Sequence, residues 1–167
     1  MKILQLCFFS NLWPEHFEVT SIDIKFGLNV LDLSSDFGKE FDIIVAAPPC
    51  VQFTKANSLR WEVSPDYFIL VASKCLSICC NSGKPWVFEN PPGRIEYFLP
   101  ALIKFRICTW HGYITNKEYV VYSNMLLLFN YAPRYGKPSS IANYSKTKRE
   151  LWQSDFFNSL FLNLVPV

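Results

Sequence analysis

An apolar segment that stops at two consecutive prolines places the strongest constraint on how this chain folds. Residues 42–47 are apolar and rich in β-branched side chains after an initial acid, which is typical of a central strand in a parallel sheet. Pro48 and Pro49 cannot donate hydrogen bonds to a neighbouring strand, so the strand is predicted to end there. Cys50 then follows the carboxyl end of a buried strand, where open α/β sheets place their ligands.

A second segment has the same pattern. Residues 85–88 form a short apolar run, followed by Glu89 and Asn90 and then by a second diproline at 91–92. The carboxyl ends of parallel strands meet at one edge of a sheet. If the two strands are neighbours, the Cys50 thiol and the Glu89 carboxyl therefore face a common pocket.

Periodicity and turn residues predict alternating strands and helices, and hence an α/β sheet that is mostly parallel with an antiparallel edge. The connections between the first four strands are too short for full crossover helices, so reduced helices are expected in the N-terminal half. Strands are predicted at residues 2–9, 17–24, 28–33, 42–47, 86–89, 106–110, 119–122 and 126–129. Helices are predicted from Pro65 to a stop at Gly83, at 95–102 and at 148–162, with a loop at 130–146.

Composition narrows the class of protein. The chain has 167 residues, of which half are apolar and 17% aromatic, so disorder is excluded and a single domain over residues 1–167 is expected. The net charge of +2 does not by itself identify a nucleic-acid partner. A late basic cluster is either a solvated surface or a phosphate-contacting one, and consists of Arg134, Lys137, Lys146, Lys148 and Arg149.

The cysteines, and the lack of targeting signals, bear on the compartment. None of the six cysteines has the paired spacing of a zinc site, and they are predicted to be reduced. There is no signal-peptide pattern and no run of 18 apolar residues, so no membrane span is expected. We predict a cytoplasmic protein, in the host cytoplasm if the chain is viral.

The two proline motifs resemble those of a known family. Residues 48–50, followed by Phe53 and Thr54, resemble the nucleophile motif of the DNA cytosine-5 methyltransferases. Residues 89–91 resemble that family's Glu-Asn-Val/Pro motif, in the family's order and at a similar separation. The nearest likeness is to the very short phage-encoded members. The resemblance covers most of the chain in order, and only these two motifs are specific.

The resemblance implies a Rossmann-like methyltransferase sheet that transfers a methyl group from S-adenosylmethionine to cytosine in DNA. Cys50 would add to C6 of a cytosine flipped out of the duplex, and Glu89 would hydrogen-bond the base at N3 and N4. Ala47 before the diproline favours this chemistry over methylation of an exocyclic amine. By the same resemblance, the other substrate-binding residues are Pro49, Thr54, Asn90 and Pro91, and the cofactor-binding residues are Phe8, Ser10, Asp23, Asp32 and Pro48.

The chain departs from the family at the cofactor loop. In the family a glycine-rich loop after the first strand holds the amino-acid end of the cofactor, whereas residues 6–12 here contain no glycine. Weak cofactor binding, mainly through the nucleoside, is therefore expected, with Asp23 on the ribose and Asp32 near the adenine. The chain also has no room for a separate target-recognition domain. It should read little DNA sequence unaided, or depend on a protein partner.

Two other functions fit the same residues. One is a catalytically silent relative that binds nucleic acid or a protein partner through an eroded cofactor site. The other is an enzyme that uses Cys50 to modify cytosine nucleotides without needing DNA. Purely structural roles are also open, because Cys50 can be a loop residue and Asp23 can simply cap a turn.

Overall fold

The computed structural model describes residues 1–7, 13, 15–50, 53, 65–91, 93–97, 103–110 and 113–124. For residues 65, 94, 103–110 and 113–119 it describes the backbone alone.

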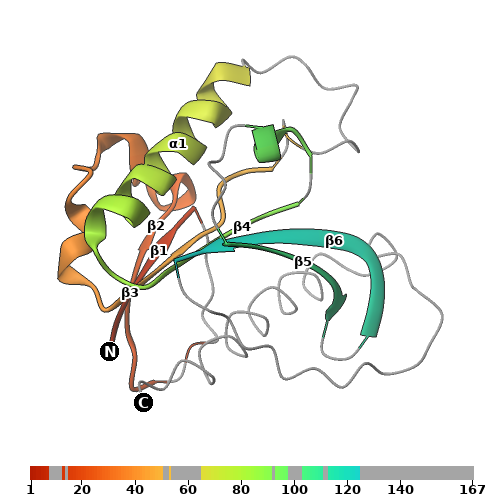
Figure 1. Ribbon diagram of the computed structural model, residues 1–167. Helices are drawn as coiled ribbons and strands as arrows, with labels where there is room; N and C mark the ends of the chain where they lie inside the picture. The colour runs from red at the N-terminus through yellow and green to blue at the C-terminus, as the bar shows by residue number, and fades with distance from the viewer. Residues whose placement is uncertain are drawn as a thin grey trace.

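The described chain forms a six-stranded mixed sheet in the order β2-β1-β3-β4-β6-β5 (Figure 1). The first four strands in this order are parallel, and β6 is antiparallel to both β4 and β5. The strands are β1 (Lys2–Leu6), β2 (Glu18–Ile22), β3 (Ile43–Ala46), β4 (Trp86–Asn90), β5 (Ile103–Trp110) and β6 (Tyr113–Ser123). The predicted α/β sheet, mostly parallel with an antiparallel edge, is therefore confirmed.

The strand order reverses between β1 and β3. From β1 the chain first adds β2 on one side, then returns to add β3 and β4 on the other side. The Ala47 N–H donates to the Leu6 carbonyl at 3.0 Å, so the two carboxyl ends stay paired past the last strand residue. Open α/β sheets bind ligands in the crevice at such a reversal. The fold therefore places a candidate crevice beside Leu6 and Ala47.

The predicted strand at residues 28–33 is wrong. Three 3-10 helices connect β2 to β3: η1 (Ile24–Phe26), η2 (Val30–Asp32) and η3 (Phe37–Glu40). The Asp23 carboxylate accepts from the Lys25 N–H at 2.9 Å, and the Asn29 side chain accepts from the Leu31 N–H at 3.1 Å. Side chains of this type stabilise local turns in competition with a strand. In this connection the expected reduction of helices to single turns is confirmed.

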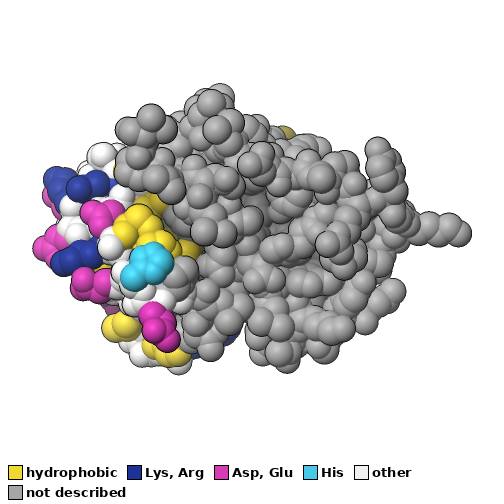
Figure 2. Space-filling view, turned by 90° about the horizontal axis from the view of Figure 1, so that it is seen from below, with side chains coloured by type: hydrophobic (Ala, Val, Ile, Leu, Met, Phe, Trp, Pro, Cys, Tyr) yellow, Lys and Arg dark blue, Asp and Glu magenta, His cyan; other side chains and the backbone are white. Residues whose placement is uncertain are grey.

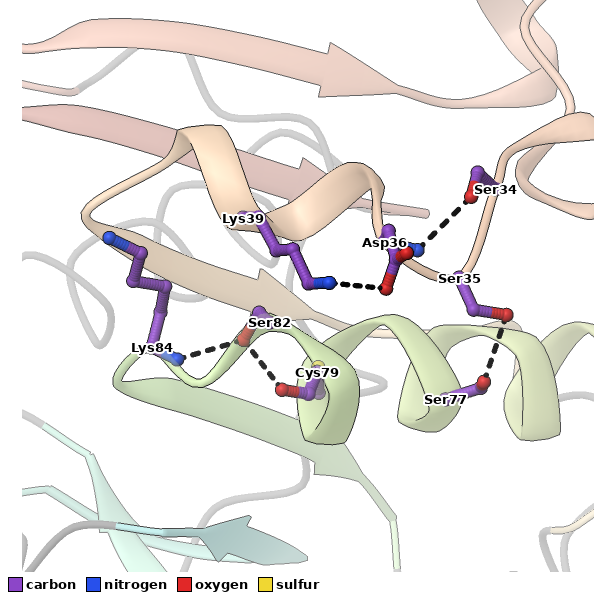
Figure 3. Close-up of polar contacts among 8 residues, drawn as sticks. All are labelled: Ser34, Ser35, Asp36, Lys39, Ser77, Cys79, Ser82 and Lys84. Atoms are coloured by element: carbon purple, nitrogen blue, oxygen red, sulfur yellow. Dashed lines mark hydrogen bonds and ion pairs between the residues drawn. The ribbon is translucent and has the colours of Figure 1, made fainter.

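Helix α1 (Pro65–Ser82) begins and ends where the sequence predicted. Gly83 has φ +66°, the left-handed conformation that glycine adopts most easily at a helix end. The Ser82 hydroxyl donates to the Cys79 carbonyl at 2.7 Å and accepts from the Lys84 N–H at 3.0 Å (Figure 3). The left-handed Gly83 and the Ser82 hydrogen bonds therefore both end α1 just before β4.

The main core lies between α1 and one face of the sheet (Figure 1). The η3 connection packs closely against α1: a Cβ added at Gly38 would lie 2.5 Å from Ile44 Cδ1 and 3.0 Å from Ser82 Cβ. The Ser77 hydroxyl of α1 also donates to the Ser35 hydroxyl at 3.2 Å (Figure 3). Core residues facing α1 include Leu4, Leu6, Ile44, Ala46, Trp86, Phe88, Val120 and Tyr122.

The opposite face of the sheet is also buried. Buried residues on that face are Ile3, Gln5, Val45, Val87, Glu89, Val121 and Ser123. Burial on both faces explains why residues 42–47 read as a continuous apolar run rather than as an alternating one.

The remaining predicted elements are confirmed in part or lie outside the described residues. A 3-10 helix, η5 (Arg94–Tyr97), occupies the start of the helix predicted at 95–102. The elements predicted at 126–129, 130–146 and 148–162 lie outside the described residues, as does the basic cluster at 134–149. In the described part of the chain, no helix combines the length and apolarity needed to cross a bilayer.

Candidate active site

The structure joins the two proline motifs at the carboxyl edge of the sheet. Strands β3 and β4 are parallel neighbours, with Ala46 opposite Phe88. Beyond these residues, the Asn90 side-chain N–H donates to the Pro48 carbonyl at 2.8 Å. Asn90 is 1% exposed and Pro48 is buried, so water does not compete for this bond. The loop that carries Cys50 and the end of β4, which carries Glu89, are thus held side by side.

Cys50 lies in a turn that is anchored on both sides. Buried Pro48 precedes it, and the Cys50 carbonyl accepts from the Phe53 N–H at 2.9 Å. Phe53 is 3% exposed and inserts into the main core. Cys50 itself is half-buried, so its thiol is held in place and is partly accessible. Thr54, the next predicted substrate-binding residue, lies outside the described residues.

Glu89 is a buried carboxyl at the end of β4. It is 4% exposed, and it alternates with Phe88 and Asn90, so its side chain lies on the face away from α1. Burying a carboxyl is unfavourable unless local contacts compensate, and such residues are frequent at functional sites. Cys50 lies beyond the end of β3. A cleft shared by the two groups would therefore lie at the sheet edge, and this common cleft stays a prediction.

Asn90 adds a feature that the sequence did not reveal. Its Oδ1 is buried and has no hydrogen-bond partner among the described residues, although its Nδ2 is bonded to Pro48. An unsatisfied buried acceptor costs about 1–3 kcal/mol. Its position between the two motifs suits an acceptor for a ligand N–H. Pro91, the neighbouring predicted substrate residue, is buried, and Pro49 is exposed.

At the crevice between β1 and β3, the first loop residue has a strained backbone. Cys7 has φ +54°, the left-handed region that favours glycine, and its N–H donates to the Ile22 carbonyl at 2.8 Å. Cys7 therefore adopts a glycine-like conformation although it carries a Cβ. The predicted cofactor residues Phe8 and Ser10 lie outside the described residues.

The two acidic residues predicted to bind the cofactor occupy different settings. Asp23 follows β2 directly and is half-buried, and its Oδ1 caps η1 through the Lys25 N–H. The alternative role of turn cap is therefore real, without excluding a ligand at the same carboxylate. Asp32 is exposed at the end of η2, and the strand that it was expected to end does not exist.

Sequence reasoning missed an apolar surface next to Asp23. Ile24 is 67% exposed and Phe26 is 51% exposed, and both belong to η1. Their exposure could not be predicted from the sequence, because Ile24 continues the apolar pattern of the preceding strand. At this strand end a carboxylate, that of Asp23, therefore lies next to two exposed apolar side chains. A carboxylate can bind ribose hydroxyls and an apolar surface can pack against a base, so the combination suits a nucleoside.

The cysteines of α1 are poor candidates for catalysis. The hydrogen bond to Cys7 and burial raise the pKa of the Cys75 thiol well above its ordinary value. Burial raises the pKa of Cys79 strongly and that of exposed Cys80 as well. Protonated thiols are weak nucleophiles, so these raised pKa values count against all three cysteines of α1 as nucleophiles. Within the described ranges, no group of three or more His, Cys, Asp or Glu side chains is arranged to hold a metal ion.

An apolar pocket of about 250 Å³ lies against α1, beside the segments that follow the two motifs. Phe53 and Ile95 form one wall, and Ala72, Leu76 and Cys80 of α1 are among the residues of the other. This pocket could not be predicted from the sequence, because its walls come together only in the folded chain.

Comparison with known proteins identifies no relative: no protein-family model matches this sequence, and a search of curated proteins finds no significant match. Surface charge adds no identification either. Figure 2 shows acidic and basic side chains mixed over the described part of one face. The function must therefore be inferred from the residues themselves.

Proposed function

We propose that this chain is a Rossmann-like DNA cytosine-5 methyltransferase, or acts on another cytosine-containing nucleic acid by the same chemistry. The observation that carries the proposal is the hydrogen bond from Asn90 to the Pro48 carbonyl. It holds together two motifs that are separated by some forty residues in sequence and that resemble the two catalytic motifs of this family. The strand order reverses beside Leu6 and Ala47 at the same sheet edge, which is where open α/β sheets bind their ligands.

In this proposal, the protein residues prepare cytosine for attack. The Cys50 thiolate adds to C6 of the flipped base, which turns the ring into an enamine whose C5 is nucleophilic. Glu89 donates or accepts hydrogen bonds at N3 and N4 and stabilises the charge that develops on the ring. Once C5 carries the methyl group, loss of the C5 proton re-forms the C5–C6 double bond and expels Cys50 as a thiolate. The rigid turn around Cys50 reduces the entropy lost in reaching this geometry.

S-adenosylmethionine would supply the methyl group as a sulfonium electrophile. The described residues fit its nucleoside half: Asp23 offers a carboxylate to the ribose hydroxyls, and exposed Ile24 offers an apolar surface to the adenine. They fit its methionine half less well, because Cys7 carries a side chain in a glycine-like conformation. The cofactor is expected to bind mainly through its nucleoside.

The nucleophile is tested by covalent trapping. A duplex containing 5-fluorocytosine, incubated with the protein and S-adenosylmethionine, should form a stable adduct at Cys50, because fluorine cannot leave as a proton does. Cys50→Ser should abolish the adduct. Cys80→Ser replaces an exposed cysteine of α1 and should leave it unchanged. An adduct of equal yield with Cys50→Ser would overturn the assignment of the nucleophile.

A catalytically silent relative is the second candidate, and the backbone of Cys7 favours it. A protein that no longer binds the cofactor has no need of glycine in the first loop. Absence of any adduct with a folded wild-type protein, together with absence of S-adenosylmethionine binding at millimolar concentration, would select this function over catalysis.

A further inference from the structure

Two cysteines from distant parts of the sequence meet at the carboxyl end of β1. The Cys7 sulfur lies 3.8 Å from the Cys75 sulfur, and the two residues are 68 positions apart in the chain. Cys75 belongs to α1 and is completely buried. Cys7 is the first residue of the loop after β1 and is half-buried. Two sulfurs at this distance are in van der Waals contact, and a disulfide bond of about 2.05 Å requires them to approach by less than about 2 Å.

We propose that Cys7 and Cys75 form a redox modification site, at which a peroxide converts the two thiols into a reversible disulfide. The proposal does not rest on the methyltransferase function, because it concerns neither Cys50 nor Glu89. It rests on the sulfur contact, on the difference in exposure between the two residues, and on the fixed elements that carry them.

The reaction consumes one peroxide and yields two waters. The Cys7 sulfur attacks a peroxide oxygen, the O–O bond breaks, and the leaving hydroxide takes up the thiol proton, which gives a sulfenic acid on Cys7 and one water. The Cys75 sulfur then attacks the Cys7 sulfur. The S–S bond forms, the S–O bond breaks, and the departing hydroxide takes the Cys75 proton as the second water. The peroxide is reduced by the two electrons that the thiols lose.

The environment of each cysteine assigns its role in this sequence. Cys7 is the more accessible sulfur and is oxidised first, whereas Cys75 is shielded from peroxide and is the resolving thiol. Because Cys75 is shielded, the second step depends on the sulfur contact that is already present in the fold. Cys7 already has the left-handed backbone of φ +54°. The disulfide would therefore fix a strained residue of the β1 loop to the centre of α1.

The test uses the full chain, treated with hydrogen peroxide and then with iodoacetamide to block remaining thiols. Peptide mass mapping should find a linked peptide pair that contains Cys7 and Cys75, and dithiothreitol should remove it. Cys75→Ala and Cys7→Ser should each abolish the linked pair. Cys7 is half-buried, so its substitution tests the proposal even if Cys75→Ala fails to fold. Cys80→Ser, five residues further along α1, should leave the yield of the linked pair unchanged.

Three results would overturn the proposal. The first is the absence of a Cys7–Cys75 linked peptide under conditions that oxidise exposed Cys80. The second is oxidation of Cys7 to the sulfinic acid without a disulfide. The third is a disulfide that joins Cys7 mainly to a cysteine other than Cys75.

Discussion

At the scale of single residues, Asn90 has two roles in the candidate site. Its amide joins the two motifs through a side-chain hydrogen bond to the Pro48 carbonyl, and it leaves a buried oxygen available as an acceptor. A donor at this position is needed because the Pro48 carbonyl points at it from the neighbouring strand end. A glutamate or aspartate would present oxygen to oxygen there.

We predict that Asn90→Asp weakens both stability and trapping of 5-fluorocytosine DNA. The substituted carboxylate accepts but does not donate, so the Pro48 carbonyl loses its partner and the free energy of unfolding should fall by about 2 kcal/mol. Urea denaturation measures the loss. Asn124→Asp is the matched control, because Asn124 also donates to a carbonyl at 2.8 Å, that of Lys84, but is exposed.

The control should lose less stability than Asn90→Asp and should keep its trapping activity. Equal losses in both variants would show that the Asn90 bond has no special role in the site.

The sequence predicted the identity of these residues better than their contacts. Cys50, Glu89 and Asn90 stood out in the sequence because diproline and strand patterns are local, whereas the hydrogen bond from Asn90 to Pro48 was not predicted. The left-handed conformation of Cys7 was not predicted, because a positive φ is expected from sequence only where the residue is glycine. The exposure of Ile24 was not found either, because apolar residues are read as buried until the fold is known.

At the scale of elements, the close packing of η3 against α1 is a clear constraint. Gly38→Ala should reduce the free energy of unfolding by about 2 kcal/mol, because the added Cβ would lie 2.5 Å from Ile44 Cδ1 and must displace it. Thermal and urea denaturation measure the effect. Lys39→Ala, the next residue of η3, removes only a surface ion pair with Asp36 and should cost about 0.5 kcal/mol or less. A Gly38→Ala variant as stable as Lys39→Ala would contradict this packing.

The buried thiols of α1 should make stability depend on alkaline pH. Burial raises the pKa of Cys79 above its ordinary value of 9.0, and contact with Cys7 and burial do the same for Cys75. Above pH 9.0 the unfolded chain loses these protons and the folded chain keeps them, so the stabilisation present below pH 9.0 is lost as pH rises. Each thiol should contribute a slope of about −1.4 kcal/mol per pH unit in the free energy of unfolding.

Urea denaturation at several pH values from about 8 to about 10.5 measures this slope. Cys79→Ala should make the slope shallower by the contribution of one thiol. The variant should also be less stable at every pH, because the substitution removes a buried side chain. An unchanged slope would show that Cys79 ionises equally in both states. Cys80→Ser should also reduce the slope, but by less than Cys79→Ala, because burial raises the pKa of Cys80 less than that of the fully buried Cys79.

Elements governed by local rules were predicted correctly. The end of α1 follows from Gly83. Its start follows from Pro65, because the first N–H of a helix has no intrahelical acceptor and proline lacks that N–H. The strand predicted at 28–33 failed because the Asn29 side chain stabilises a turn that competes with the apolar pattern. A short apolar run does not distinguish these outcomes by itself.

At the scale of the whole molecule, the sheet order decides what the motifs can do. The pairing of β3 with β4, and the reversal between β1 and β3, bring residues from three separate segments to one edge. Neither follows from any one segment, since both depend on contacts between residues far apart in sequence. The sequence predicted a shared edge only on the condition that the strands were neighbours, and the structure meets that condition.

The cofactor crevice gives the prediction that depends on the entire fold. Binding of S-adenosylmethionine should be weak, with a Kd of about 50 μM or higher, equivalent to ~−6 kcal/mol. The nucleoside half has Asp23 and Ile24 to contact, whereas Cys7 prevents the close backbone approach that the methionine half requires. Adenosine should therefore compete measurably, and calorimetric titration gives both affinities.

Asp23→Ala should remove most of this affinity, because the ribose hydroxyls lose their carboxylate. The same change also removes the cap of η1, so the control must lose a cap without losing a ribose contact. Asn29→Ala meets this need, since Asn29 caps η2 through the Leu31 N–H in the same way. Its affinity should stay within about twofold of wild type, a difference of about 0.4 kcal/mol. Submicromolar binding that is insensitive to Asp23→Ala would place the cofactor elsewhere, because no ligand held at the end of β2 can ignore the carboxylate that follows it.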